Sequence, residues 1–484
     1  MTGDRRDRTL MPRQTITKTE MLIVAGTSLK MPPNSSKMGD GNGHGLGRPA
    51  ETPEKRAGRP PPTRPGGADL AGHRDRGRAL DQGKAGKAYP SLQDRGQAEA
   101  RREPGPEGRR PGFQVIENHY HVDTWYGKAR LTAGLEIKGE VLSLLGRDRS
   151  FLDRDLNSAL FIDLETTGLS GGAGTVPFLI GAGFYREEKF NILQFFLEDL
   201  GAEPAMIHDF AAFLAGTGFR SVVSYNGKVF DLPLLEGRFV MHRKALALSG
   251  LPHLDFLFPA RTLWSHKQES CRLCELARDI LEVEREEDIP SAEIPWRYFE
   301  YLRTRDFSLI EPVLYHNQED LLSLLGVVIA GAGLFSDDAD RSGGGAVDAM
   351  DWFGAAKVLE KTGDHDRSAD FIRRALAGRL TEKVEIEAKK KLAAYFKRNQ
   401  DWEKAAGLWQ EMAPLEQLFC FRELAMYHEH RRKDLRAAAD IAERGLERAA
   451  GVSPFYEADF SHRLERLRAK LTAQKNKGPA PERG

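Results

Sequence analysis

The segment LFIDLETTGLSGG, Leu160 to Gly172, places two acidic residues directly after a short apolar run. An apolar run that ends in a glycine-rich turn is typical of a buried β-strand. Residues i and i+2 of a strand point to the same side, so Asp163 and Glu165 would share the face of Phe161. The opposite face is apolar and carries Leu160, Ile162 and Leu164. Taken alone, the two acids fit solvated loop residues, a helix cap or half of a metal site.

The residues around this strand alternate between strand and helix patterns, which is typical of an α/β domain. Order is predicted to begin near Phe113, and the domain is predicted to span residues 113–335. Three further strands are expected in VPFLIGAGFY, FNILQFFLED and RSVVSYNG. Helices are expected in EPAMIHDFAAFLAGTG, KVFDLPLLEGRFVMHRKAL and DFSLIEPVLYHNQEDLLSLLGVVIAGAGLF. The last helix is nearly all apolar in its second half and should be buried.

Charge is divided unevenly along the 484 residues, although the totals balance at 71 basic and 71 acidic side chains. Residues 1–110 hold 22 Lys and Arg against 13 Asp and Glu, which leaves 49 against 58 for the rest. Because apolar residues are sparse there, a disordered basic Pro/Gly/Arg-rich extension is predicted over 1–112. It would allow non-specific nucleic-acid binding, with a plain solvated extension as the alternative. The net charge of the remainder excludes a strongly basic nucleic-acid-binding fold.

The C-terminal part of the chain carries a helical repeat pattern. After SDDADRSGGGAVD, a predicted linker at 336–348, three segments each combine a polar turn with an Ala-rich amphipathic run. Spacings of 37 and 33 residues separate the turn aspartates, Asp364, Asp401 and Asp434. A period near 34 residues is typical of tetratricopeptide-like helix pairs, which are predicted over 349–473, before a disordered tail at 474–484. A plain helical bundle is the alternative.

Cysteines and apolar runs bear on the cellular compartment. Three cysteines are present, and two of them, Cys271 and Cys274, form a single C-x-x-C. A structural zinc site usually takes four ligands from two such pairs, so ordinary thiols are expected, with zinc as the alternative. The longest apolar run, Leu321–Phe335, is shorter than the roughly 20 residues of a membrane span. These features predict a cytoplasmic protein with no membrane segment.

Further candidate acids follow later in the domain. Asp231 comes just after the predicted strand and Asn-Gly turn of SYNGKVFDLPLL, where it would also suit the first turn of a helix. In YHNQEDLLSLL, His316 and Asp320 are four residues apart and share one helix face. Taken alone, a buried histidine beside a surface aspartate is the better explanation of that pair.

Taken together, a strand D-x-E, an Asp after a later strand and a His/Asp helix pair resemble the DEDD exonucleases, which have a ribonuclease H-like fold. Five segments, in order, are similar to the bacterial YprB-like branch of predicted exonucleases: FIDLETTGLSGGAGTVPFLIGAGF, SYNGKVFDLPLL, HLDFLFPARTLW, EDIPSAEIPWRYFEYLRTRD and YHNQEDLLSL. The resemblance covers about 113–335. It implies an α/β ribonuclease H-like domain, a mixed sheet with flanking helices, followed by an all-α repeat domain.

The resemblance also implies a two-metal site. Its ligands would be the four carboxylates, Asp163, Glu165, Asp231 and Asp320. Oxygen ligands suit Mg²⁺ or Mn²⁺, and two such ions can activate a water and stabilise the leaving oxygen of a phosphodiester. His316 is expected to complete the catalytic set beside them.

The sequence departs from the family pattern at that histidine. One DEDD type has His five residues before the last Asp, and the other has Tyr four before it. Here Tyr315 is five before Asp320, and His316 is four before it. On a helix, a residue four positions before Asp320 lies on the same face as Asp320. A residue five positions before it is rotated away by about 140°. We therefore expect His316 to lie near the attacking water, with Tyr315 as the alternative.

Substrate contacts are predicted in the turns next to the acids. The candidates are Thr166, Gly168, Asn226 and Lys228, for which plain turn roles are the alternative. The SGGAG run at 170–174 would let backbone amides approach a phosphate, or would form a tight turn. Asp255 and Arg261 fit an internal ion pair or a substrate-supporting role.

Three functions follow from these patterns. The first is a metal-dependent nuclease, a 3′-to-5′ exonuclease on single-stranded DNA or RNA ends, with the direction implied by the resemblance. The second is a catalytically weak ribonuclease H-like platform whose helical repeats bind a protein partner. The third is a nucleic-acid binder that acts through the basic extension.

Overall fold

The computed structural model describes residues 112–168, 174–286, 288–336, 347–415 and 417–476. Three predicted segments lie wholly or mostly outside these ranges: the N-terminal extension, the linker and the C-terminal tail. Most of the SGGAG run lies outside them as well.

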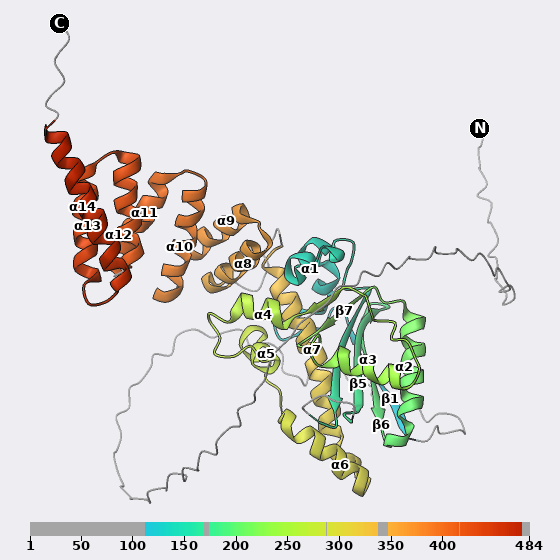
Figure 1. Ribbon diagram of the computed structural model, residues 1–484. Helices are drawn as coiled ribbons and strands as arrows, with labels where there is room; N and C mark the ends of the chain where they lie inside the picture. The colour runs from blue at the N-terminus through green and yellow to red at the C-terminus, as the bar shows by residue number, and fades with distance from the viewer. Residues whose placement is uncertain (1–111, 169–173, 287, 337–346, 416, 477–484) are drawn as a thin grey trace, which may run out of the picture. The chain divides into compact units, whose positions relative to one another are not determined.

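A six-stranded mixed sheet forms the centre of the α/β domain (Figure 1). Its order is β1-β6-β5-β4-β7-β8. The first four strands pair antiparallel, whereas β4, β7 and β8 run parallel. Their bounds are β1 Phe113–His121, β4 Ala159–Thr166, β5 Pro177–Arg186, β6 Lys189–Leu197, β7 Ser221–Ser224 and β8 His253–Asp255. A separate ribbon pairs β2 Trp125–Tyr126 with β3 Ala129–Arg130. The sheet confirms the predicted fold class and the predicted strands.

Strand β4 divides its side chains between two cores, as the alternation in the sequence predicts. On one face Phe161 joins the core beneath helix α7, Glu311–Gly333. The opposite face joins a second core and carries Leu160, Ile162 and Leu164. Because Asp163 and Glu165 share the side of Phe161, the strand aims both acids at the α7 face.

Helices cover both faces of the sheet (Figure 1). One core is shared with α2 Glu203–Thr217, α3 Asp231–Met241 and α6 Ile294–Thr304. The other is shared with α1 Gly139–Gly146, α4 Leu257–Trp264, α5 Leu273–Leu281 and α7. Short 3₁₀ turns are η2 Leu131–Glu136, η3 Arg149–Phe151, η4 Leu200–Ala202, η5 Ser291–Glu293, η6 Phe307–Leu309 and η7 Ala413–Leu415, and η8 His428–Arg432 is a π-turn. The second half of α7 is buried, as its apolar sequence predicts.

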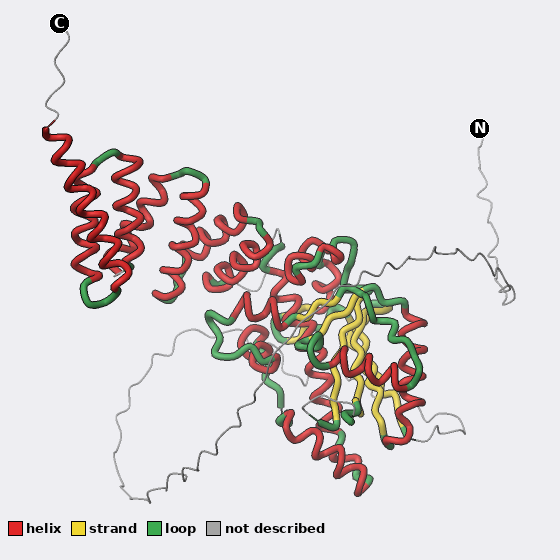
Figure 2. The backbone as a smooth tube through the Cα atoms, viewed as in Figure 1, coloured by secondary structure: helices red, strands yellow, loops and turns green. Residues whose placement is uncertain are grey.

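The residues after 347 fold as helices joined by short loops (Figure 2). They are α8 Ala349–Thr362, α9 His365–Leu376, α10 Glu382–Arg398, α11 Trp402–Met412, α12 Leu418–Tyr427, α13 Leu435–Ala449 and α14 Pro454–Asn476. The three turn aspartates are N-caps, because each side chain accepts a backbone N–H three residues on: Asp364 caps α9, Asp401 caps α11 and Asp434 caps α13. The all-helical class is confirmed, and the tetratricopeptide assignment stays a prediction.

Helix α8 packs against α4 of the α/β domain. The Trp264 indole donates a hydrogen bond of 3.0 Å to Asp351 Oδ1, and Lys267 forms a 2.5 Å ion pair with the same carboxylate. Gly354 packs so closely on the Leu263 carbonyl that a Cβ at this position would clash with it. The first C-terminal helix therefore forms part of the same packed unit.

No helix within the described residues combines the length and apolar character that a bilayer span requires.

Candidate active site

The carboxyl ends of parallel strands bring the predicted acids to one edge of the sheet. Asp163 and Glu165 lie at the end of β4, and Asp231 opens α3 just after β7. Because β4, β7 and β8 run parallel, Asp255 at the end of β8 reaches the same edge. In open α/β sheets, functional sites collect at this edge.

Burial and mutual repulsion disfavour ionisation of these acids. Burial, then the nearby Asp320 carboxylate, raises the pKa of Asp163 to about 7, although His316 and an amide hydrogen bond act in the other direction. Burial and Asp163 raise the pKa of Glu165 well above its ordinary value. The same two causes raise the pKa of Asp231. The cluster therefore carries negative charge that its own residues compensate only in part.

Two side-chain amides, linked by a hydrogen bond, orient Asp163. Asn317 of α7 donates from Nδ2 to Asp163 Oδ2 at 2.8 Å, and its Oδ1 accepts a 2.9 Å hydrogen bond from Gln194 of β6. Gly181 pairs with Asp163 across the β5–β4 ladder, and a Cβ at this glycine would clash with the Asn317 amide. The bare glycine thus lets α7 approach the sheet closely enough to reach the acid. No local sequence pattern marks Asn317, Gln194 or Gly181 as supporting residues.

His316 lies between a supporting carboxylate and the acid cluster. Its Nδ1 is 2.6 Å from Asp288 Oδ1. Its Nε2 is 3.6 Å from Asp320 Oδ2 and 3.9 Å from Glu165 Oε1. Burial alone would lower the pKa of His316, but the hydrogen bond to Asp288 and the neighbouring acids raise it to about 9. The imidazole is therefore fixed in orientation and charged in the absence of other cations.

A buried arginine links the same groups. Arg285 pairs with Asp320 Oδ1 at 2.6 Å and with Asp288 Oδ2 at 3.1 Å, and it also donates to Ser323 Oγ at 2.9 Å. Its Nε is buried without a hydrogen-bond partner in the described structure. Arg285 and Asp288 lie in a loop with no periodic pattern, so only their contacts identify them.

The predicted substrate residues serve two turns beside the cluster. Thr166 Oγ1 donates to the Gly168 carbonyl at 2.8 Å and closes the turn after β4. Asn226 has a left-handed φ of 67°, a conformation that asparagine tolerates. The backbone N–H groups of Asn226 and Lys228 donate to the Asp255 carboxylate at 2.7 and 3.1 Å.

Those contacts revise the interpretation of Asp255. Within the described residues it forms no ion pair with Arg261, so the internal-pair alternative is wrong. Its carboxylate instead accepts backbone N–H groups, including that of Leu257 at 3.2 Å. Asp255 therefore shapes the turn that delivers Asp231.

A family model described as the RNase_H superfamily matches residues 160–330, which contain all the candidate acids. The chain is also 31% identical over 375 residues to the "Uncharacterized protein YprB" of Bacillus subtilis (strain 168). That alignment covers 76% of this chain and 85% of the relative. The chain belongs to the YprB-like family of the RNase H superfamily. Membership of the RNase H superfamily indicates nucleic-acid processing as the class of function.

Divalent metals are common in the RNase H superfamily, and the donor chemistry here fits them. Hard carboxylate oxygens are the ligands that Mg²⁺ and Mn²⁺ favour. Across the described residues, however, no three Asp, Glu, His or Cys side chains converge in an ion-holding arrangement. Asp320 Oδ1 is engaged by Arg285 and Asp163 Oδ2 by Asn317. The set therefore fits a divalent cation in charge and chemistry, and its carboxylates would rotate to bind one.

The C-x-x-C pair does not lie in a metal-binding environment within the described residues. Cys271 is half-buried and Cys274 exposed, and both are free thiols. Burial raises the pKa of each thiol, which disfavours the thiolate that zinc requires. The part of the chain that the structure describes holds no cluster around them that could bind a metal.

Proposed function

We propose that this protein is a divalent-metal-dependent nuclease that hydrolyses phosphodiester bonds. The observation that carries the proposal is the cluster of partly uncompensated carboxylates at the carboxyl edge of the sheet, next to a histidine that another carboxylate orients. The 3′-to-5′ exonuclease direction and the preference for single-stranded ends of DNA or RNA rest on the resemblance to DEDD exonucleases.

The cation ligands in this proposal are the four carboxylates, Asp163, Glu165, Asp231 and Asp320. When bound, two Mg²⁺ or Mn²⁺ ions would activate a water and stabilise the leaving oxygen. The chain itself supplies the geometry: Asn317 holds Asp163, and Asp255 shapes the turn before Asp231. These contacts would hold Asp163, at the end of β4, and Asp231, just after β7, at the same edge of the sheet.

His316 is proposed as the group that orients and deprotonates the attacking water. Its Nε2 faces Asp320 and Glu165, while Asp288 fixes the opposite ring nitrogen. Cations held by Glu165 and Asp320 would weaken the attraction of these two carboxylates for a proton on Nε2, whereas Asp288 would keep its contact with Nδ1. A neutral Nε2 can then accept a proton near pH 7. Tyr315 remains the alternative residue for this role.

The test compares cleavage of end-labelled DNA and RNA oligonucleotides with Mg²⁺ or Mn²⁺ present. Wild type should shorten the strand stepwise from its 3′ end, and Asp163→Asn and Asp320→Asn should not. Asp440→Asn is the matched control, because Asp440 is an exposed aspartate on α13. Equal activity in all four proteins would overturn the proposal.

One observation favours a second function, a platform whose C-terminal helices bind a protein partner. Arg285 pairs with Asp320 and so provides an internal counter-charge for one of the candidate ligands. Calorimetric titration with Mn²⁺ separates the two functions. Heat of binding that disappears in Asp163→Asn supports the nuclease, and a wild type that binds no Mn²⁺ supports the platform.

A further inference from the structure

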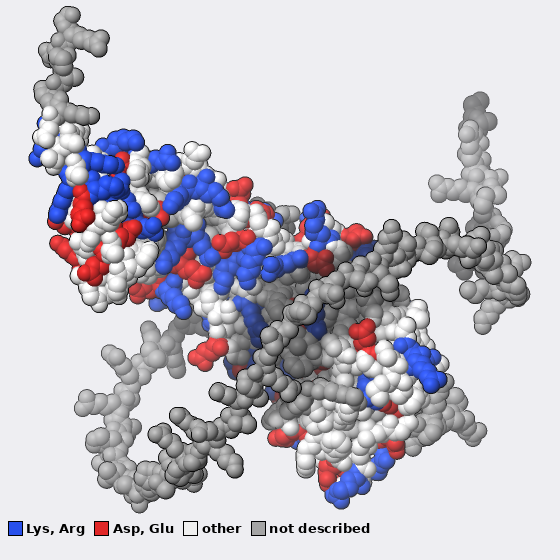
Figure 3. All heavy atoms as spheres, in the orientation of Figure 1, with Lys and Arg blue, Asp and Glu red and all other residues white. Residues whose placement is uncertain are grey.

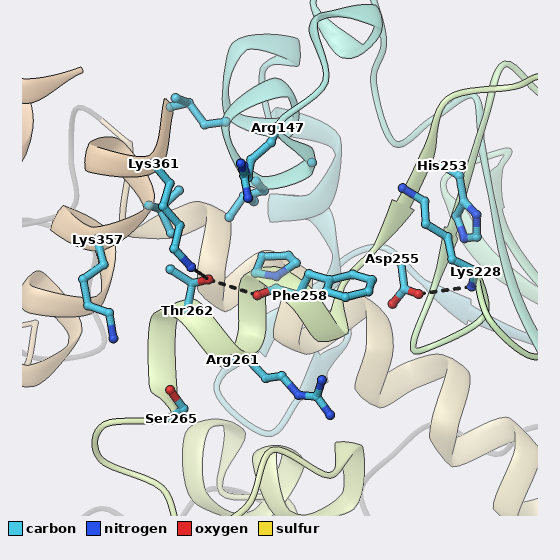
Figure 4. Close-up of a pocket in the computed structure, with 15 residues that line it drawn as sticks. Arg147, Lys228, His253, Asp255, Phe258, Arg261, Thr262, Ser265, Lys357 and Lys361 are labelled. Atoms are coloured by element: carbon cyan, nitrogen blue, oxygen red, sulfur yellow. Dashed lines mark hydrogen bonds between the residues drawn. The ribbon is translucent and has the colours of Figure 1, made fainter. Parts of the chain in front are cut away.

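A second site lies beside the acid cluster. A cavity of about 580 Å³ opens where α1, α4, α8 and the turn before α3 meet (Figure 4). Its volume is within the roughly 300–1,000 Å³ that ligand pockets occupy. Five of its lining side chains are basic: Arg147, Lys228, Arg261, Lys357 and Lys361.

Most of these cations have no anionic partner. Within the described residues, no ion pair within 4 Å involves Arg147, Arg261 or Lys357. Lys361 donates a 2.9 Å hydrogen bond to Thr262 Oγ1, a neutral group. The lining contains one carboxylate, Asp255, which is occupied by backbone N–H groups. Positive charge therefore predominates in the lining, although Glu387 and Glu360, which lie outside it, act on Lys357.

This concentration contrasts with the rest of the chain. Beyond residue 110, acidic side chains outnumber basic ones by 58 to 49. On the face drawn in Figure 3, Lys and Arg gather along the C-terminal helices but are mixed with Asp and Glu. A cavity lined by one sign of charge focuses the potential and attracts an anion.

An aromatic ring adds a second kind of contact. Phe258 lines the cavity and is 51% exposed, although most large apolar side chains of the domain are buried. Figure 4 shows it between Lys361 and Thr262 on one side and Lys228 and Asp255 on the other. Cations that bind phosphates around a ring on which a base can stack are the usual components of single-strand binding grooves.

The cavity adjoins the acid cluster through the turn before α3. Lys228 lines the cavity and lies three residues before Asp231. Asp255 also lines it, and its carboxylate accepts the N–H groups of Asn226 and Lys228 in the turn that leads to Asp231. A strand seated in the cavity would therefore continue directly into the candidate active site.

We propose that this basic cavity binds the phosphodiester backbone of a single nucleic-acid strand, a few nucleotides from the end that is cleaved. Arg147 and Arg261 of the α/β domain and Lys357 of α8 contact successive phosphates, and Phe258 stacks on a base. The inference rests on the proposed nuclease function and assigns α8 to its substrate path.

The test measures binding without cleavage. The full-length protein, in EDTA, is titrated against a fluorescent single-stranded oligonucleotide at several salt concentrations. The cavity variant Arg147→Gln/Arg261→Gln/Lys357→Gln should bind about tenfold more weakly or worse. The slope of log K against log salt should become shallower by about 2, at roughly 0.7 per single-strand phosphate contact. The single variant Arg261→Gln should show about a third of that change in slope.

A matched control removes the same charge elsewhere. Arg379, Lys383 and Arg398 are exposed, lie outside the cavity lining and form no ion pair within the described residues. Arg379→Gln/Lys383→Gln/Arg398→Gln should bind like wild type. Equal affinity of the cavity variant and this control would overturn the inference. If the cavity variant unfolds, the single variant decides: equal slopes of log K against log salt for wild type and Arg261→Gln would overturn the inference.

Two further arms identify what is bound. If a nucleoside monophosphate displaces the oligonucleotide at comparable concentration, the cavity takes free nucleotides and the strand proposal is wrong. Asp163→Asn should bind the strand at least as tightly as wild type. Because binding is measured without metal, a failure of the cavity is distinguishable from a failure of the nuclease, which appears only as lost cleavage.

Discussion

The acid cluster and the basic cavity lie on either side of one turn, Asn226 to Lys228, and hold their charges in opposite ways. The acids are short, partly buried side chains, and two of them have a close partner: Asn317 holds Asp163, and Arg285 holds Asp320. The cations are long side chains from α4, α8, the end of α1 and the turn before α3, and most have no ionic partner within the described residues. A site for chemistry needs fixed geometry, whereas a strand path needs charge that adapts to a flexible polymer. Single changes should therefore abolish the first and only weaken the second.

The largest effect is expected at Asp163. Asp163→Asn should lower turnover by about 10²- to 10³-fold or more, the scale of losing one preorganised catalytic group. In EDTA the same change should raise the melting temperature, because it removes a buried carboxylate whose ionisation is disfavoured. Activity assays and thermal melts check both. If Asp163→Asn melted at a lower temperature and kept its activity, the acid cluster would not differ from the cavity in the way described. Removal of charge from the cavity should leave the melting temperature unchanged.

A smaller loss is expected at Asp288. Asp288→Asn should lower turnover about 10- to 100-fold, the range for partners that orient a catalytic histidine. The pKa of His316 should fall from about 9, because Asp288 is the strongest group that raises it. NMR titration of the imidazole in metal-free protein measures this shift, which a merely structural role would not produce. Asp306→Asn, at an exposed aspartate, is the control and should leave the imidazole titration unchanged.

Gly181 tests how closely α7 must approach the sheet. Gly181→Ala should destabilise the fold by about 1–3 kcal/mol, the usual cost of overpacking, and should reduce activity by displacing Asn317 from Asp163. Gly216→Ala is the control, since a Cβ there meets no atom within 4 Å. Chemical denaturation of both variants measures the difference. If the two alanines behaved alike, the close approach would have no role in building the site.

The smallest effect concerns pH. Asp163 has a folded pKa of about 7 against about 3.9 in an unfolded chain, so its contribution to stability is full below pH 4 and is lost as pH rises to 7. His316, raised to about 9, loses its contribution between about pH 6.5 and 9. Both act in the same direction, so metal-free protein should melt lower at pH 8 than at pH 5. Added Mn²⁺ should restore a few degrees at pH 8 and much less at pH 5, which differential scanning fluorimetry can measure.

The sequence predicted the parts of the site that depend on local periodicity. The alternation in β4 placed Asp163 and Glu165 on one face, and helical spacing placed His316 beside Asp320. Local patterns carry such information because strand and helix geometry repeats every 2 and 3.6 residues. The strand order and the N-cap roles of the turn aspartates were not predicted and are seen only in the structure.

The supporting residues were not predictable in this way. Asn317 reaches Asp163 across 154 positions of sequence, and Asp288 reaches His316 from an irregular loop 28 residues away. The cavity brings together Arg147, Arg261 and Lys357, which are far apart in the sequence. Such contacts depend on how helices pack on the sheet, and no single segment records that packing. The predicted Asp255–Arg261 ion pair was wrong for the same reason. The Asp255 carboxylate accepts backbone N–H groups instead.

The contacts between α4 and α8 limit where the chain can be truncated. Asp351 is tied to both Trp264 and Lys267, and Lys357 and Lys361 of the same helix line the cavity. Truncating the chain before α8 would expose the Trp264 side chain and remove Lys357 and Lys361 from the cavity lining. Hairpins farther along, each closed by its own capping aspartate, can be gained or lost without reaching the cavity. Removing the helices after α9 should therefore leave the cavity lining intact, whereas removing α8 should not.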